Sequence, residues 1–292
     1  MDTVLQLTRG NPLALGNLLI LINPAYDVFT AVCEPDGSRK QLISQIRFHI
    51  GSQSAQLVFL TLDEDDEGAI TVLLEEMIKT AGTWGALNVT CELESDALFY
   101  EAFRHADFNV WAKQKLWRFK RVPREYKAGK FQWRVWHSDD ARAMRGLYNA
   151  VIPKLFHNFE PLSRRAMLGM VYYNAEGDLR GYADMVYGPK GIWILPIIHP
   201  TTVGNPEVLL GLLSALPFPG KRPVYVCVRS YQPWLEDILS RMDVEVSPEQ
   251  VLMVKHLAIK QKVGNKLGVR SLESGHADAG MPVVHFEQKD AH

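Results

Sequence analysis

The sequence contains an internal repeat. Residues 55–119 align without a gap with residues 191–255, so that each position lies 136 residues before its counterpart. The identical residues are few; in the first copy they include Val72, Leu73, Leu74, Cys91, Asp107, Gln114 and Leu116. The order of apolar and polar patterns is shared over the whole length. Such a repeat predicts one supersecondary unit folded twice, so the fold of one copy constrains that of the other.

Each copy shows the pattern strand, polar loop, helix, strand, helix, strand. In the first copy these elements are predicted at 56–63, 71–82, 86–93, 96–106 and 114–120. In the second copy they are predicted at 192–199, 206–216, 223–230, 233–242 and 250–259. Upstream, each copy begins with a strand (4–7 and 132–135), a helical stretch and a hairpin that turns near Asp36-Gly37 or Glu176-Gly177. The sequence predicts an α/β (α+β) protein of two tandem units, each a mixed, mostly antiparallel sheet flanked by helices.

The repeat also suggests the domain boundaries. The first unit is expected at 1–120 and the second at 131–262, joined by a basic linker at 121–130 that contains Pro123 and Gly129. Residues 263–292 lack sustained periodicity and are expected to form a tail. The alternative is that 281–286 adds a short strand to a sheet edge or engages a protein partner.

Composition excludes several classes of function. Lys plus Arg is 32 and Asp plus Glu is 33, and this balance argues against a nucleic-acid-binding protein. The three cysteines form no Cys-x-x-Cys pair and the nine histidines show no metal-ligand spacing, so no metal is expected. Cys91 and Cys227 are expected to be buried core thiols at equivalent strand positions. No apolar run is long enough for a membrane helix, and Asn17 interrupts the signal-like segment 13–22, so we expect a cytoplasmic protein.

Three local segments carry a resemblance to a known family. Residues 176–186 (EGDLRGYADMV) and 192–200 (IWILPIIHP) resemble a hairpin and the central strand of the GNAT superfamily of acyl-CoA-dependent acetyltransferases. Residues 98–108 (LFYEAFRHADF) resemble the helix that carries its Tyr-x-x-x-(Gly)-Phe signature. The resemblance implies direct attack of an amine on a thioester. That reaction needs a cradle for the CoA pyrophosphate, a donor to the thioester carbonyl and an acid for the leaving thiolate.

The cradle in this family is a glycine-containing turn at the start of the helix after the central strand. In the first copy this turn reads Asp63, Glu64, Asp65, Asp66 and Glu67, whose negative charges would repel a polyanion. We therefore expect no CoA there; a solvated helix cap or a Ca²⁺ or Mg²⁺ site are the alternatives. In the second copy the turn is uncharged and consists of Thr201, Thr202, Val203, Gly204 and Asn205.

The carbonyl donor is expected on the central strand of the second copy. Pro196 has no N–H to give to a ladder, which predicts a bulge or a splayed strand pair, or simply a distorted strand without a ligand. Members of the family splay this strand, and the pantetheine arm enters the gap. The resemblance therefore points to the backbone of Ile197 and Ile198 as the donor.

The acid is harder to place. Tyr100 lies in the signature helix of the first copy, where the family often keeps a tyrosine acid, and its counterpart in the second copy is Glu236. Tyr231 and Cys227 are further candidates in the second copy. Packing is the alternative role for each.

Acceptor contacts are expected from His157, Asn158 and Glu160, a polar cluster in the first helical region of the second copy. The chain is thus expected to be an acyl-CoA-dependent N-acyltransferase acting on a small-molecule or peptide amine, with the acetyl-CoA or other acyl-CoA held by the C-terminal unit. The alternative is a catalytically inactive scaffold or binding module. Neither nucleic acid nor a membrane is an expected partner.

Overall fold

A computed structural model describes residues 2–10, 25–33, 42–61, 67–95, 99–120, 131–162, 169–202, 206–217 and 219–257. Residues 1–259 form one compact unit that contains both repeats. The predicted linker, the tail, the acidic residues 63–66, the turn at Asp36-Gly37 and the signal-like segment lie outside the described residues. Within the described residues, no helix is long and apolar enough to cross a membrane.

A twelve-stranded sheet is the framework of this unit, in the order β1-β2-β3-β4-β12-β5-β10-β9-β8-β7-β6, with β11 also paired to β5. The strands of the first repeat are β1 (Tyr26–Cys33), β2 (Leu42–His49), β3 (Ser54–Leu60), β4 (Asn88–Glu94) and β5 (Asn109–Phe119). Those of the second are β6 (Trp133–Val135), β7 (Met170–Tyr173), β8 (Leu179–Tyr187), β9 (Ile192–Ile198), β10 (Val224–Arg229), β11 (Glu245–Val246) and β12 (Gln250–His256). In both repeats an antiparallel meander leads to a parallel pair, β3 with β4 and β9 with β10.

Six α-helices are described: α1 (Thr3–Arg9), α2 (Glu67–Thr83), α3 (Tyr100–His105), α4 (Ala141–Val151), α5 (Glu207–Ser214) and α6 (Pro233–Leu239). Helices α2 and α3 share a buried apolar cluster with β2, β3 and β4. Helices α5 and α6 share the corresponding cluster with β9 and β10. Helix α4 packs on the other face of the second repeat, against β7, β8 and β9. The predicted fold class, with helices flanking a mixed, mostly antiparallel sheet in each repeat, is confirmed.

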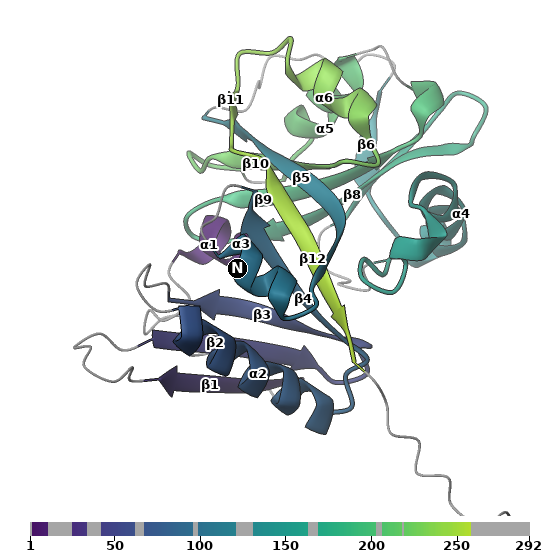
Figure 1. Cartoon of the computed structure of the whole chain (residues 1–292). Coiled ribbons are helices and arrows are strands. Elements are labelled where there is room, and N and C mark those ends of the chain that lie inside the picture. The colour runs from purple at the N-terminus through teal and green to yellow at the C-terminus, as the bar shows by residue number, and fades with distance from the viewer. Residues whose placement is uncertain are drawn as a thin grey trace, which may run out of the picture. The chain divides into compact units, whose positions relative to one another are not determined.

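The repeats exchange their last strands. Strand β12 of the second repeat pairs with β4 of the first, and β5 of the first pairs with β10 of the second. The two exchanged strands then pair with each other, so that β12 lies between β4 and β5 (Figure 1). Each repeat is therefore completed by the other, and the sheet is continuous across both.

The register of β11 and β12 on β5 reveals a pseudo-twofold axis. Gln250 lies opposite Gln114, its own counterpart in the repeat. On one side of this pair Glu245 lies opposite Arg118, and on the other side Val254 lies opposite Asn109. These two pairs are the same positions with the repeats interchanged. A register that maps onto itself in this way supports the duplication predicted from the sequence.

The predicted strand at 4–7 is wrong, because these residues belong to helix α1. Asp2 caps the helix through its carboxylate, which accepts a hydrogen bond from the N–H of Leu5 at 3.0 Å. Val4 and Leu7, one turn apart, pack against a buried cluster of Leu116, Trp193, Leu195 and Cys227. The short apolar run at 4–7 is compatible with a strand, and the spacing of three residues between Val4 and Leu7 is equally compatible with a helix. The cap at Asp2 favours the helix.

Cys91 and Cys227 are both buried, as predicted, but they are not equivalent. Cys91 belongs to the apolar cluster of α2 and α3. Cys227 belongs to a smaller cluster with Val4 and Leu7 of α1, on the face away from α5 and α6. Because successive side chains on a strand point to opposite faces, a shift of one residue between repeats is enough to cause this difference.

Candidate functional site

The parallel pair β9/β10 opens after three residue pairs. The last pair is Ile194 with Val226, although β9 continues to Ile198 and β10 to Arg229. On its other side β9 stays paired with β8 through Ile198. The predicted splay beside Pro196 is therefore confirmed. We call the space between the two strands beyond this last pair the β9/β10 gap.

The side chain of Gln232 bridges this gap. Its amide nitrogen donates to the carbonyl of Pro196 at 2.9 Å, and its amide oxygen accepts from the N–H of Ile198 at 3.1 Å. Gln232 is fully buried. The backbone donor that the sequence assigned to Ile198 thus faces the gap, and in this structure an amide of the chain itself satisfies it. The side chain of Ile197 belongs to the apolar cluster beneath α4, and the role of its backbone as a donor stays a prediction.

A buried charge cluster lies at the end of β10. Arg229 Nε donates to one carboxylate oxygen of Glu160 at 2.9 Å, and the hydroxyl of Tyr231 donates to the other at 2.6 Å. Arg229 Nη1 also donates to the amide oxygen of Gln114, which accepts the thiol of Cys227 at 3.1 Å. The side chains of Arg229 and Glu160 are 9% and 10% exposed, so the pair is shielded from water. Removal of either side chain would leave a buried charge without a partner.

Burial and the charges within this cluster shift the pKa values of Arg229 and Tyr231. Burial has the largest effect on the pKa of Arg229 and lowers it, but the Glu160 carboxylate, together with Cys227, Tyr231 and Glu92, leaves the pKa above its usual value. Burial and then the same carboxylate raise the pKa of Tyr231 well above its usual value. At neutral pH, Arg229 is therefore charged and Tyr231 carries its proton.

The sequence predicted Tyr231 and Glu160 for different roles, as acid and as acceptor contact, and the structure brings them into direct contact. The sequence assigned Arg229, the last residue of β10, no role in this cluster, and it missed Gln232, which follows Tyr231. A charged residue at the end of an apolar strand was the available signal for Arg229. For Gln232 no local signal distinguishes a gap-bridging amide from a surface one.

The remaining predicted acids lie elsewhere. Glu236, on α6, forms an ion pair with Lys115 at 2.6 Å and is partly exposed. Tyr100 begins α3 and packs half-buried against the core of the first repeat. Five residues before Phe108, at the tyrosine position of the signature, stands Phe103, which is fully buried. Catalytic roles for Tyr100 and Glu236 stay predictions.

The predicted donor loop is described only at its start. Thr201 is exposed and lies 2.8 Å from Nδ1 of His199 through its hydroxyl. The hydroxyl of Thr202 is buried and has no hydrogen-bond partner among the described residues. Val203, Gly204 and Asn205 lie outside the described residues.

The first repeat opens in the same way. Its parallel ladder ends at Gln56 and Thr90, again after three pairs. The carbonyl of Val58, two residues beyond the last pair, accepts a hydrogen bond from the N–H of Asp2 at 2.9 Å. Pro196 likewise lies two residues beyond the last pair of its ladder.

The start of helix α1 thus occupies this second gap. The N–H of Thr3 donates to the carboxylate of Glu92 on β4 at 2.9 Å, while Asp2 holds β3. Asp2 is fully buried, and its carboxylate lies 2.5 Å from Arg47 in an ion pair whose geometry is not that of a hydrogen bond. Both gaps are therefore satisfied from within the chain, by α1 in the first repeat and by Gln232 in the second.

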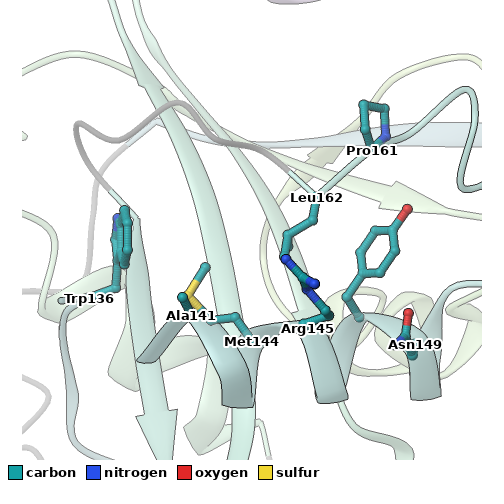
Figure 2. A pocket seen from close by; sticks show the side chains of 8 residues that line it. Trp136, Ala141, Met144, Arg145, Asn149, Pro161 and Leu162 are labelled. Carbon is teal, nitrogen blue, oxygen red and sulfur yellow. The ribbon is translucent and has the colours of Figure 1, made fainter. Parts of the chain in front are cut away.

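A cavity of about 460 Å³ lies beside α4 in the second repeat. Figure 2 shows Met144 and Arg145 rising from α4 toward Leu162, with Pro161 on the far side and Trp136 at one end. Tyr148 also lines it, and its hydroxyl donates to the backbone carbonyl of Glu160 at 2.7 Å. The cavity wall at Tyr148 is thus hydrogen-bonded to Glu160, whose carboxylate belongs to the buried cluster.

The predicted acceptor residues lie along this segment. The ring of His157 is tilted by 42° against that of Tyr148 with ring centroids 4.5 Å apart, and its Nε2 lies 3.0 Å from the carbonyl of Ile152. Asn158 is exposed, and its carbonyl accepts from Ser54 at 3.3 Å. In the described part of the chain, no group of three or more His, Cys, Asp or Glu side chains is arranged so that it could hold a metal ion.

Comparisons with known proteins give no sequence match. No protein-family model matches the chain, and no curated protein does. Among solved structures, a GCN5-related N-acetyltransferase from Kribbella flavida superposes with a TM-score of 0.51 at 13% identity, covering 78% of this chain and 89% of that one. One from Sphaerobacter thermophilus has a TM-score of 0.50 at 11% identity, with 74% and 76% covered.

A third similar structure, a conserved protein of unknown function from Staphylococcus epidermidis, has a TM-score of 0.51 at 12% identity, with 70% of this chain and 84% of that one covered. Identities this low carry information about the fold alone. The strand order, the splayed parallel pairs and these superpositions agree: the chain has the fold of the GCN5-related N-acetyltransferases, the GNAT fold.

Proposed function

We propose that the chain is an acyl-CoA-dependent N-acyltransferase whose acyl donor enters the β9/β10 gap. The observation that carries this proposal is the early end of the ladder at Ile194 and Val226, which turns the backbone of Pro196 and Ile198 toward the gap. An extended ligand with amide groups finds there one acceptor and one donor. The N–H of Ile198 is then available to a thioester carbonyl, where negative charge develops during transfer.

Gln232 supports this assignment because its side chain is itself an amide. Its amide nitrogen takes the place of a pantetheine N–H on the carbonyl of Pro196, and its amide oxygen takes the place of the thioester carbonyl on the N–H of Ile198. An unsatisfied buried group costs about 1–3 kcal/mol, so a ligand that takes over both bonds exchanges them without leaving either strand group unpaired. Binding then requires Gln232 to turn out of the gap.

The reaction needs one proton moved. The amine nitrogen bonds to the thioester carbon, the carbon–sulfur bond breaks, and the sulfur leaves as a thiolate that takes a proton. Tyr231 carries a proton and donates to Glu160, so Tyr231 protonates the thiolate, Glu160 receives the proton that the amine loses, and that proton passes from Glu160 to Tyr231 along their hydrogen bond. Arg229 holds Glu160 in place through its ion pair. The unpartnered hydroxyl of Thr202 adds a donor at the start of the loop.

Thermal denaturation with CoA and acetyl-CoA tests the proposal. Saturation at 100 times the dissociation constant adds about 2.7 kcal/mol to the free energy of unfolding, so the melting temperature rises. Thr202→Asp, which adds a negative charge to the donor loop, is expected to abolish the rise. Thr83→Asp, an exposed site at the end of α2, is the matched control and is expected to keep it.

Gln232→Ala separates the gap from other CoA sites. Its melting temperature is expected to be lower without ligand, because two strand groups lose their partner, and its rise with CoA is expected to exceed that of the wild type. Absence of any rise at millimolar CoA in the wild type contradicts the proposal.

A second candidate function is a non-catalytic scaffold. It is favoured by one specific observation, that both gaps are already satisfied by the chain itself, through Asp2 in one repeat and Gln232 in the other. Thiol release from acetyl-CoA with a panel of amines distinguishes the two candidates. Release that depends on Tyr231 supports the transferase, and CoA binding without release supports the scaffold.

A further inference from the structure

The cavity beside α4 has a distinct chemical character. Trp136, Met144, Pro161 and Leu162 give it apolar walls, and Arg145 is the only charged residue among the eight described residues that line it. Apolar walls with one polar group fixing orientation are typical of small-molecule sites.

Arg145 is exposed and forms no ion pair with any described residue, and two acids on the segments around the cavity are engaged elsewhere. Asp140, before α4, accepts both Arg134 and Tyr173. Glu160 accepts Arg229 and Tyr231. The guanidinium therefore remains for an anion that comes with the ligand, and a carboxylate is the group it binds in a bidentate manner.

Tyr148, another lining residue, connects the cavity wall to the buried cluster. Tyr148 lies three residues after Arg145 on α4, a rise of about 4.5 Å. Its hydroxyl binds the backbone of Glu160, whose carboxylate meets Tyr231. A ligand with its carboxylate on Arg145 and its body against Trp136 and Leu162 also contacts Tyr148, which lines the same cavity.

We propose that this cavity binds the acceptor amine, and that the acceptor carries a carboxylate and an apolar body, as an apolar amino acid does. Arg145 sets this specificity. The role of this ligand as the acceptor in the transfer reaction rests on the proposed function. The binding of its carboxylate by Arg145 does not depend on that function.

The test measures binding of L-phenylalanine and of its amide, phenylalaninamide, to the full chain without acyl-CoA, by isothermal titration calorimetry. The acid is expected to bind about tenfold more tightly than the amide. Arg145→Gln is expected to remove that preference and leave the affinity for the amide unchanged. Arg142→Gln, an exposed arginine on the same helix that does not line the cavity, is the control and is expected to keep the preference.

The outcomes separate this inference from the proposed function. Equal binding of acid and amide, or a preference that survives Arg145→Gln, overturns the carboxylate site even if acetyl-CoA raises the melting temperature. A preference that depends on Arg145, with no effect of CoA on the wild type, supports the carboxylate site and contradicts the transferase.

Discussion

Gln114 and Gln250, counterparts in the two repeats, are hydrogen-bonded to each other at 2.6 Å where β5 and β12 cross the pseudo-twofold axis. Gln114 donates its amide nitrogen to the amide oxygen of Gln250, which also accepts the hydroxyl of Thr3 at 3.2 Å. The amide oxygen of Gln114 accepts a hydrogen bond from Arg229. One chain of polar groups thus joins the filled gap of the first repeat to the buried cluster of the second.

This pair predicts an energetic coupling between the repeats. Methionine has nearly the shape of glutamine without its hydrogen bonds, so Gln114→Met is expected to lower the free energy of unfolding by about 2 kcal/mol, because Arg229 loses an acceptor in the interior. Gln250→Met is expected to cost about 1 kcal/mol. Urea denaturation of both single variants and the double variant is expected to show a coupling of about 1 kcal/mol. Gln132→Met, at an exposed site, is the control; strict additivity would contradict direct coupling.

The filled gap of the first repeat predicts that Asp2 stabilises the fold. Asp2→Ala removes the cap of α1 and the partner of Arg47, and is expected to cost about 2 kcal/mol in urea denaturation. Asp2→Asn keeps a capping oxygen and is expected to cost less. Asp237→Ala, exposed on α6, is the control. If Asp2→Ala costs no more than this control, α1 does not hold the gap closed.

Asp140 predicts a loss of stability in acid. Its carboxylate accepts Arg134 in two hydrogen bonds, and also Tyr173 and the N–H of His137. The hydrogen bonds from Arg134, with smaller contributions from Tyr173 and His137, hold the pKa of Asp140 far below its usual value of 3.8. A carboxyl whose pKa is lowered by folding stabilises the protein above its unfolded pKa, and this contribution disappears as the pH falls through the folded value.

Urea denaturation at pH 7, 5 and 3 measures the effect. Asp140→Asn is expected to be less stable than the wild type by about 2 kcal/mol at pH 7 and pH 5, with a smaller difference at pH 3. Asp178→Asn breaks an exposed ion pair with Arg180 and is expected to change stability by less than about 1 kcal/mol at every pH. A difference for Asp140→Asn that does not shrink in acid would contradict the assigned role.

The cysteines are expected to differ in reactivity. Burial raises the pKa of Cys91 and of Cys227 to about 12, so both remain protonated thiols at pH 8. Cys33 is only partly buried. Titration of the native protein with a disulfide reagent at pH 8 is expected to modify Cys33 alone, and Cys33→Ser is expected to remove the reaction. Modification of all three without denaturant would show that the core around β4 and β10 opens readily.

Local sequence patterns predicted most of the secondary structure. Apolar runs located β3, β4, β9 and β10, and helical spacing located α2, α5 and α6, because the period of burial is a local property of each segment. Pro196 predicted the splay because a missing N–H cannot complete a ladder on any partner strand. The segment 4–7 shows the limit: four residues carry too little periodicity, and a cap outside them decided the outcome.

The candidate site divides in the same way. The chemistry of Tyr231 and Glu160 was visible as residue type, but their contact at 2.6 Å joins residues 71 positions apart and depends on packing. The bridge from Gln232 forms because β10 does not pair with the last residues of β9, and where that pairing ends depends on the packing of the sheet. The mismatch of Cys91 and Cys227 arose because an ungapped alignment preserves sequence position, whereas the sheet tolerates a one-residue shift that reverses the face.

The sequence by itself determined that one unit occurs twice, which segments become strands and helices, and which side chains are apolar enough to be buried. Only the tertiary structure decided that β5 and β12 change places, that α1 closes one gap and that an amide closes the other. The physical reason is that burial periodicity is written within a few consecutive residues. The partner of a strand edge or of a buried polar group, in contrast, is chosen among all segments that reach it, and that choice is made by the free energy of the whole packed sheet.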